Sequence, residues 1–460
     1  MSWSCLLAGG ILALVGAYAA PQGAERQSDG PSQRRIAVGP NVRVSEPGVS
    51  HVEPYIAAHP KDAGSLVIVG SRDDGRVVVA EGFVSSDAGR TWSACRLPEV
   101  ATFGQSVDNW VAFGADGVAY LSTLGSRIPG QTWGGILVYR STDRGRSWEG
   151  PTVLPGNSYD RPSLAAGGNA AAPRLFVSVL AMGSDRRVFP TPVEGDGVAV
   201  LVSDDNARSF TRLAFIAPDN LAHQGYVPAV LPDGSLLIPY IDYPVMTHDE
   251  LADMRRDPAQ ARFNATRLFV VPSPDGGRTF GLPRFVADVP RMFGGPAELA
   301  VDTSSGAFRG RVYAAWNGGT EERRDVTVAR SSDGGRGWTK TQMRAPGAGA
   351  AHFASLAVSR QGVVGVTWLQ HEDPVERREC YRIYFAASAD GGASFTEPVV
   401  VSDAVSCPTP EGNPRTLGRW VRGTDYLGMA AGADGTFHPV WVDARSGVFE
   451  VYTAALRVAP

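Results

Sequence analysis

One eight-residue phrase recurs six times in this chain and constrains the fold more than any other feature. The copies are SSDAGRTW from Ser85, STDRGRSW from Ser141, SDDNARSF from Ser203, SPDGGRTF from Ser273, SSDGGRGW from Ser331 and SADGGASF from Ser388. They follow one another at intervals of roughly 55–70 residues, which is typical of structural units that stack or close into a ring. The chain is therefore predicted to be a modular array.

Each phrase has the chemistry of a tight turn between two strands. In the first copy, the side chains of Ser85 and Asp87 can bond to nearby backbone N–H groups. Gly89 tolerates positive φ, and Trp92 can begin the next strand as a buried aromatic anchor. The third copy has Ala207 at the glycine position, so its turn is expected to be the most strained.

The phrase resembles the Asp box, S-x-D-x-G-x-[ST]-[WF], of BNR-repeat β-propellers of the sialidase superfamily. The six copies extend from Ser85 to Phe395, so the resemblance covers most of the chain. It implies an all-β propeller of four-stranded blades. The 54 glycines and 33 prolines agree with many short strands joined by turns.

A second recurring phrase, a strand with a D-G-type turn and an apolar strand after it, gives the number of blades. It occurs seven times, from PYIAAHPKDAGSLVIVGSR to YLGMAAGADGTFHPVWVDAR, and the last unit ends one strand short. The segment Asn41–Glu46 can supply that strand, which would close the ring and remove two exposed sheet edges. We predict seven blades, with six blades, as in catalytic sialidases, as the alternative.

The N-terminus predicts export. Residues 1–20 combine an apolar run with Ala17-Tyr18-Ala19, the pattern of a signal peptide, and residues 21–35 are expected to form a disordered polar leader. Residues 36–460 are then a single propeller domain, secreted or periplasmic, without a membrane span and expected to be monomeric. A net charge of −4 does not predict nucleic-acid binding.

The mature chain would retain three cysteines. Cys380 and Cys407 fall in loops at one face of neighbouring units, so a disulfide between them is expected, with two free thiols as the alternative. Cys95 is left over. No Cys/His spacing indicates zinc, and no cofactor is expected, although Ca²⁺ in an acid-lined channel stays an open alternative.

In this arrangement the Asp boxes lie on one face, and propeller enzymes that resemble this chain have their active sites on the other. Several inner strands begin there with an acidic residue: Glu53, Asp108, Asp160 and Asp425. These acids could instead accept backbone N–H groups and pair with local arginines. Glu298 is an acid within an inner strand where other units carry Trp110, Ser163, Ser355 or Gly428, so it is the most distinctive candidate.

The resemblance to sialidases implies three arginines on a substrate carboxylate, an Asp acid/base, and a Tyr nucleophile assisted by Glu. The catalytic candidates are Glu298, Tyr426, Asp108 and Asp160. The candidate substrate-binding residues are Arg72, Arg161 and Arg445. The family's F/Y-R-I-P motif is absent: the one R-I-P begins at Arg127, after the first Asp box, so its role is not assigned to Arg127.

Three functions follow from this pattern. The first is a glycoside hydrolase of exo-α-sialidase type that acts on an acidic sugar of a glycan or glycoconjugate. The second is a non-catalytic ring that binds a glycan or protein partner, and the third is another propeller enzyme, such as a lyase or a hydrolase of a different sugar.

Overall fold

The structure is a computed structural model. The residues that it describes are 35–73, 75–127, 134–155, 159–169, 171–182, 196–216, 222–243, 266–289, 298–320, 323–344, 349–372 and 380–459. The signal peptide expected at residues 1–20 lies outside these ranges, as does the leader except for its last residue.

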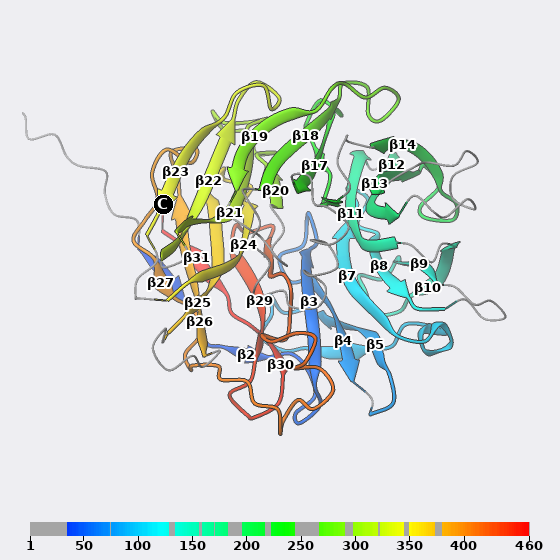
Figure 1. The fold of residues 1–460 in the computed structure, drawn as a ribbon, viewed down its shortest axis with the longest axis vertical. Coiled ribbons are helices and arrows are strands. Elements are labelled where there is room, and N and C mark those ends of the chain that lie inside the picture. The colour runs from blue at the N-terminus through cyan, green and yellow to red at the C-terminus, as the bar shows by residue number, and fades with distance from the viewer. Residues whose placement is uncertain are drawn as a thin grey trace, which may run out of the picture.

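Seven antiparallel sheets surround a central axis, each forming one blade (Figure 1). Blade 1 contains β3 (His51–Ala58), β4 (Leu66–Asp73), β5 (Val78–Ser85) and β6 (Ser93–Cys95), and blade 2 contains β7 (Ser106–Phe113), β8 (Ala119–Gly125), β9 (Gly135–Ser141) and β10 (Glu149–Pro155). Blade 3 contains β11 (Tyr159–Asn169), β12 (Ala172–Met182), β13 (Asp196–Ser203) and β14 (Thr211–Ile216).

Blades 4 to 6 continue the same pattern. Blade 4 contains β15 (Ala222–Gly225), β16 (Ala229–Val230), β17 (Leu236–Tyr243), β18 (Thr266–Ser273) and β19 (Arg284–Val289). Blade 5 contains β20 (Glu298–Val301), β21 (Val312–Thr320), β22 (Arg323–Ser331) and β23 (Thr339–Met343), and blade 6 contains β24 (Ala351–Val358), β25 (Val364–His371), β26 (Tyr381–Ser388) and β27 (Val399–Val400). In the described residues the only helical element is the 3₁₀ turn η1 (Val100–Phe103), and no helix there is long and apolar enough to span a bilayer.

Blade 7 is made from both ends of the chain. It contains β28 (Gly428–Ala431), β29 (Phe437–Asp443), β30 (Glu450–Thr453) and β31 (Leu456–Val458) together with β1 (Ile36–Val38) and β2 (Val42–Arg43). Val42 pairs with Thr453 in the β2–β30 ladder, which confirms the predicted closing strand and the count of seven blades. The pairing of β1 with β31 adds a contact that the sequence did not predict.

The core lies between neighbouring blades. Because each sheet packs against a blade on both sides, its middle strands are apolar on both faces, as in Val67, Ile68 and Val69 of β4, which are all fully buried. One such cluster joins Tyr313 of blade 5 to Trp368 of blade 6. The ring is thus held by repeated sheet-to-sheet interfaces.

The Asp-box turns have the expected hydrogen bonds. Asp87 Oδ1 accepts the backbone N–H groups of Arg90 and Thr91 at 3.0 and 2.9 Å, and Ser85 Oγ accepts that of Gly89 at 2.9 Å. Ala207 has a φ of +61° in the third box, so a residue with a Cβ occupies a left-handed conformation there, as the sequence predicted.

These turns share one face of the ring with the turns between the first and second strands. Arg144, in the second Asp box, forms an ion pair with Asp62, in the β3–β4 turn, at 2.5 Å. Arg311, just before β21, donates to the carbonyl oxygen of Gly391 in the last box at 2.7 Å. The inner strands therefore begin at the opposite face, which is called the channel mouth below.

Candidate functional site at the channel mouth

Four inner strands bend at the same point near the channel mouth. The pairing register shifts there in β3, β7, β11 and β24, by a β-bulge or a similar irregularity. The residues with positive φ at these bends are Glu53, Asp108, Arg161 and Phe353, at 54°, 57°, 50° and 55°. Such φ values are strained for residues with a Cβ, and strain of this kind clusters at functional sites. The repeated bend positions two acids and an arginine around one end of the channel.

Glu53 is the centre of a buried network. Its Oε2 accepts the backbone N–H of Asp108 at 2.9 Å, and its Oε1 accepts the Trp420 indole N–H at 2.7 Å. Burial, and then the charge of Asp425, raises the pKa of Glu53 to about 7 despite these two donors. The carboxyl group is therefore able to exchange a proton near neutral pH.

Asp108 and Asp160 form an acid pair beside Glu53. Burial is the main cause that raises the pKa of Asp108 well above its usual range, and the charges of Glu53 and Asp160 add to it. Among the described residues, Asp108 Oδ2 is buried with no hydrogen-bond partner. Asp108 therefore holds its proton at pH values where an isolated aspartate would lose it.

The charges of three arginines act on Asp425. Arg161 is buried and approaches Asp425 at 3.5 Å, and Arg419 and Arg422 also act electrostatically on that carboxylate. Burial nevertheless leaves the pKa of Asp425 raised. Burial opposes the charge of Arg161, but the carboxylates of Asp425, Asp160 and Asp108 outweigh it and raise its pKa. Arg161 is therefore a fixed cation in this group.

Glu298 lies at the start of β20 in blade 5, and its carboxylate contacts two other blades. Its Oε2 accepts the Ser355 hydroxyl of blade 6 at 2.5 Å. The Tyr55 hydroxyl of blade 1 is close enough that it and Glu298 perturb each other's pKa. Burial raises the pKa of Glu298 to about 7; burial, and then the Glu298 charge, raises the pKa of Tyr55 well above its usual range. The tyrosine–glutamate pair thus joins blades that are not neighbours in the ring.

Aromatic rings line the same end of the channel. The Tyr55 ring packs against Trp110 at 5.6 Å and Tyr426 at 6.3 Å between centroids, and Trp110 and Tyr426 are 4.7 Å apart. Tyr426 is fully buried, and its hydroxyl accepts the backbone N–H of Asn109 at 2.9 Å. Tyr55 is only half-buried. The tyrosine beside Glu298 is therefore Tyr55, and Tyr426 supports the wall behind it.

The predicted residues separate into two groups. Asp108, Asp160, Arg161, Glu298 and Tyr426 lie at or directly behind the channel mouth. Arg72 pairs instead with Glu46 at 3.6 Å, and Arg445 pairs with Asp443 at 2.7 Å and with Asp403. Within the described part of the chain, neither arginine has a hydrogen bond or ion pair with the acid cluster, because each lies beyond the inner strands and is neutralised locally.

The structure also joins Cys380 and Cys407 by a disulfide, with their Cα atoms 4.2 Å apart. Cys95 is a buried free thiol. The bond connects the start of β26 to the crossover that carries Arg419, Trp420 and Arg422, so it anchors the segment that supplies these residues to the channel mouth.

The sequence analysis named Glu53 without choosing it as a catalytic candidate, and it did not select Tyr55, Trp420, Arg419 or Arg422. Trp420, Arg419 and Arg422 belong to the long crossover before β28. In a crossover of this length, the sequence does not indicate which residues turn inward. An alignment of the seven units within the sequence could have found part of the site. It would have placed Glu53, Asp108 and Arg161 at equivalent positions of successive inner strands.

The sequence matches no family model and no curated protein. Among solved structures, the K499G mutant of NanB sialidase from Streptococcus pneumoniae aligns with 73% of this chain and 68% of its own at 10% identity and a TM-score of 0.50. A Dyadobacter fermentans protein of unknown function gives 0.48, at 15% identity over 92% and 99% of the two chains. Penicillium chrysogenum alpha-L-arabinanase, complexed with arabinobiose, gives 0.45, at 16% identity over 73% and 94%.

The chain is therefore a seven-bladed β-propeller with a sialidase-like fold. Because identity to the solved structures is so low, the likeness defines the fold and leaves the chemistry to the channel mouth.

Proposed function

We propose that this protein is an exported glycoside hydrolase whose active site is the channel mouth. The observation that carries the proposal is the pairing of Tyr55 with Glu298 across the channel, where burial raises the pKa of Glu298 to about 7. A carboxylate that exchanges its proton near neutral pH is suited to activate a neighbouring hydroxyl.

In the proposed reaction Tyr55 is the nucleophile and Glu298 its base. The Tyr55 oxygen attacks the anomeric carbon while its proton passes to Glu298, and the bond to the leaving oxygen breaks. Water then attacks the anomeric carbon of the glycosyl–tyrosine intermediate and gives its proton to the acid/base group. The bond to the Tyr55 oxygen breaks, and this oxygen recovers its proton from Glu298. The Ser355 hydroxyl bond to Glu298 Oε2 keeps the carboxylate oriented throughout.

The Asp108–Asp160 pair is the proposed acid. Because the pKa of Asp108 is raised well above its usual range, Asp108 keeps a proton, which can pass by way of Asp160 to the leaving oxygen. Asp160 is only partly buried, so it is the member that can reach the substrate, with Asp108 behind it.

We further propose that the substrate is an acidic sugar, with exo-α-sialidase as the specific activity. Arg161 pairs with the Asp425 carboxylate, and the charges of Arg419 and Arg422 also act on it; guanidinium groups that act on one carboxylate are suited to bind another. The set predicted from the sequence combined Arg161 with Arg72 and Arg445. The proposed set keeps Arg161 and has Arg419 and Arg422 in place of the other two.

The test is hydrolysis of fluorogenic glycosides by purified protein, with an α-sialoside, an α-L-arabinofuranoside and a β-galactoside compared in parallel. Tyr55→Phe and Glu298→Gln should each reduce kcat at least about 100-fold, while Tyr426→Phe should keep kcat within about threefold. In wild type, kcat/KM should rise as Glu298 ionises through pH about 7. Turnover that is unaffected by Tyr55→Phe and by Glu298→Gln would refute the assigned site. Preference for a neutral sugar would refute the sialidase specificity.

A non-catalytic binding ring is the second candidate. It is favoured by the neutralisation of Arg72 and Arg445 and by the ion pair that already occupies Arg161. Absence of turnover on all three glycosides, together with saturable glycan binding that Arg161→Ala abolishes, would support this function over hydrolysis.

A further inference from the structure

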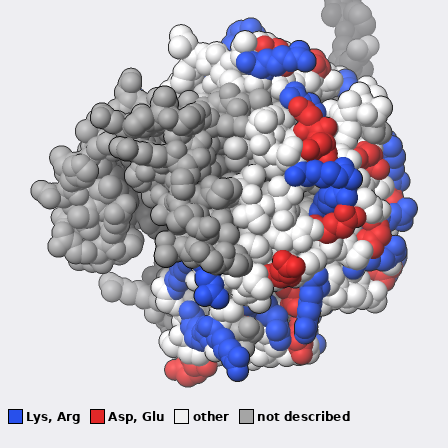
Figure 2. Space-filling view, turned by 90° about the vertical axis from the view of Figure 1, so that its right-hand side faces the viewer, with Lys and Arg blue, Asp and Glu red and all other residues white. Residues whose placement is uncertain are grey.

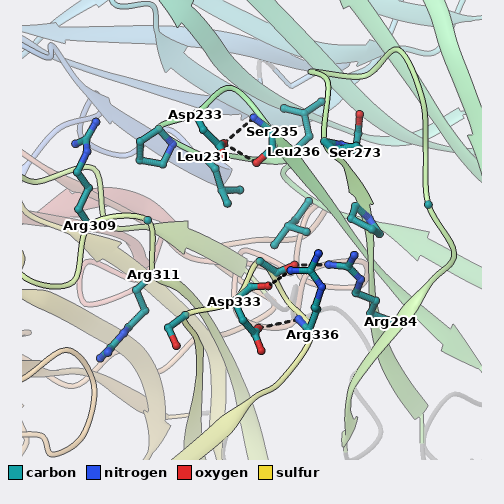
Figure 3. A pocket seen from close by; sticks show the side chains of 18 of the residues that line it. Leu231, Asp233, Ser235, Leu236, Ser273, Arg284, Arg309, Arg311, Asp333 and Arg336 are labelled. Carbon is teal, nitrogen blue, oxygen red and sulfur yellow. Dashed lines mark hydrogen bonds between the residues drawn. The ribbon is translucent and has the colours of Figure 1, made fainter.

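A large groove opens on the Asp-box face, at the opposite end of the ring from the channel mouth. It encloses about 880 Å³ between blades 4 and 5 (Figure 3). Its walls are four loops: the β16–β17 turn, the Asp boxes that follow β18 and β22, and the β20–β21 turn. This volume is within the range of sites that hold small ligands or several sugar units.

The β20–β21 turn is what makes the groove large. It runs from Asp302 to Arg311, and the N–H of Gly310 donates to the Asp302 carbonyl oxygen at 2.8 Å. Asp302 Oδ1 also accepts the Ser304 N–H at 2.8 Å. These bonds give the long turn a fixed shape, so they hold this wall of the groove in place.

Guanidinium groups project from these walls, and each is held by a backbone carbonyl oxygen. Arg284 donates to Gly334 at 2.6 Å, Arg309 to Thr303 at 2.6 Å and Arg336 to Asp333 at 2.8 Å. Arg311, at the margin, donates to Gly391 and lies over the Phe308 ring at 4.4 Å. Among the described residues, no carboxylate oxygen lies within 4.0 Å of any of these four guanidinium groups. The carbonyl contacts hold the four groups in place, and within the described residues none of them forms an ion pair.

The two acids that line the groove are occupied by their own turns. Asp233 Oδ1 accepts the backbone N–H and hydroxyl of Ser235 at 2.9 and 2.6 Å. Asp333 Oδ1 accepts the backbone N–H groups of Arg336 and Gly337 at 2.9 and 3.0 Å. On the side of the molecule in Figure 2, by contrast, acidic and basic side chains are interspersed. The groove is a local excess of positive charge on a chain of net charge −4.

We propose that this groove binds an acidic polysaccharide through the carboxylate groups of its uronic acids or through its sulfate groups. Arginine is suited to both oxyanions because its fork can form two parallel hydrogen bonds, and the carbonyl contacts reduce the entropy lost on binding. The Ser332 hydroxyl and the exposed ring of Pro232 add a polar and an apolar contact that a sugar ring can use.

The walls favour a polysaccharide over an acidic peptide. A peptide that binds by adding a strand needs an open sheet edge, whereas this groove is lined by turns whose backbone groups bond within the turns. Binding in this groove does not depend on catalysis at the channel mouth, because it is measured without turnover.

The chain offers a matched control for the test. Arg90, in the first Asp box, donates to the Asp87 carbonyl oxygen at 3.0 Å, as Arg336 does to that of Asp333, but Arg90 does not line the groove. Calorimetric titration of the full protein would use polygalacturonate, chondroitin sulfate, neutral dextran and poly-glutamate as four separate probes. The variants are Arg309→Ala/Arg336→Ala and Arg90→Ala.

We expect at least one acidic polysaccharide to bind, with the double variant weakening it about tenfold or more and Arg90→Ala changing it less than twofold. Raising the salt concentration should weaken binding. The first two probes distinguish carboxylate from sulfate recognition. No binding of either acidic polysaccharide, equal losses in both variants, or equally tight binding of poly-glutamate would overturn the proposal. Hydrolysis of a small fluorogenic glycoside should be unchanged in the double variant.

Discussion

Glu53 Oε2 accepts the Asp108 backbone N–H at 2.9 Å, so the carboxylate of one bent inner strand fixes the bend in the next. The same carboxylate binds the Trp420 indole N–H through Oε1. A single buried side chain thereby connects blade 1, blade 2 and the crossover into blade 7. The strain of positive φ at both residues is stabilised by this shared network.

Glu53→Gln should destabilise the protein by about 1–3 kcal/mol. The NH₂ group of the glutamine would face either the Asp108 backbone N–H or the Trp420 indole N–H, and a buried donor facing a donor is left without a hydrogen bond. Urea unfolding followed by tryptophan fluorescence would measure the loss. Glu149→Gln is the control, since Glu149 is exposed on β10 and should change stability by less than about 0.5 kcal/mol. Equal effects of the two changes would contradict the network.

Glu298 should make folding stability depend on pH in a defined direction. Its folded pKa of about 7 exceeds the ordinary value of 4.5, so the folded state binds more protons than the unfolded state between these values. Its contribution to stability should therefore fall as pH rises from about 4.5 to 7. Thermal unfolding across this range should show a flatter dependence in Glu298→Gln than in wild type, and an unchanged slope would contradict burial of an ionisable Glu298.

Ala207→Gly should stabilise the protein by about 1 kcal/mol, because glycine adopts the φ of +61° without the Cβ clash. The reverse change in the first box, Gly89→Ala, should destabilise it, since φ is +81° there and a Cβ would lie 3.3 Å from Leu66 Cδ1. Paired melting curves test both. Stabilisation by Gly89→Ala would show that these turns are not constrained by φ.

Removal of the disulfide with Cys380→Ala/Cys407→Ala should reduce stability by about 3 kcal/mol, because the bond closes a loop with a separation of 27 residues. The intact mass of the wild-type protein should be lower by two hydrogens than that of its fully reduced form. Cys95 should be alkylated only after unfolding because it is buried. Rapid alkylation of three cysteines in native protein would contradict this assignment.

The sequence alone determined the repeating unit, the number of blades, the strand that closes the ring and the face occupied by the Asp boxes. These features could be predicted because they depend on turns of a few residues and on the order of neighbouring strands. Ala207 illustrates this, since its strained φ follows from its place in an eight-residue phrase.

Only the tertiary structure decided which side chains meet at the channel mouth. Tyr55 and Glu298 are 243 positions apart and become neighbours because seven inner strands converge on one axis. Likewise, Arg161 approaches Asp425 at 3.5 Å although the two residues are 264 positions apart in the chain. Such contacts depend on bends and crossovers in several blades at once, so no local pattern in the chain specifies them.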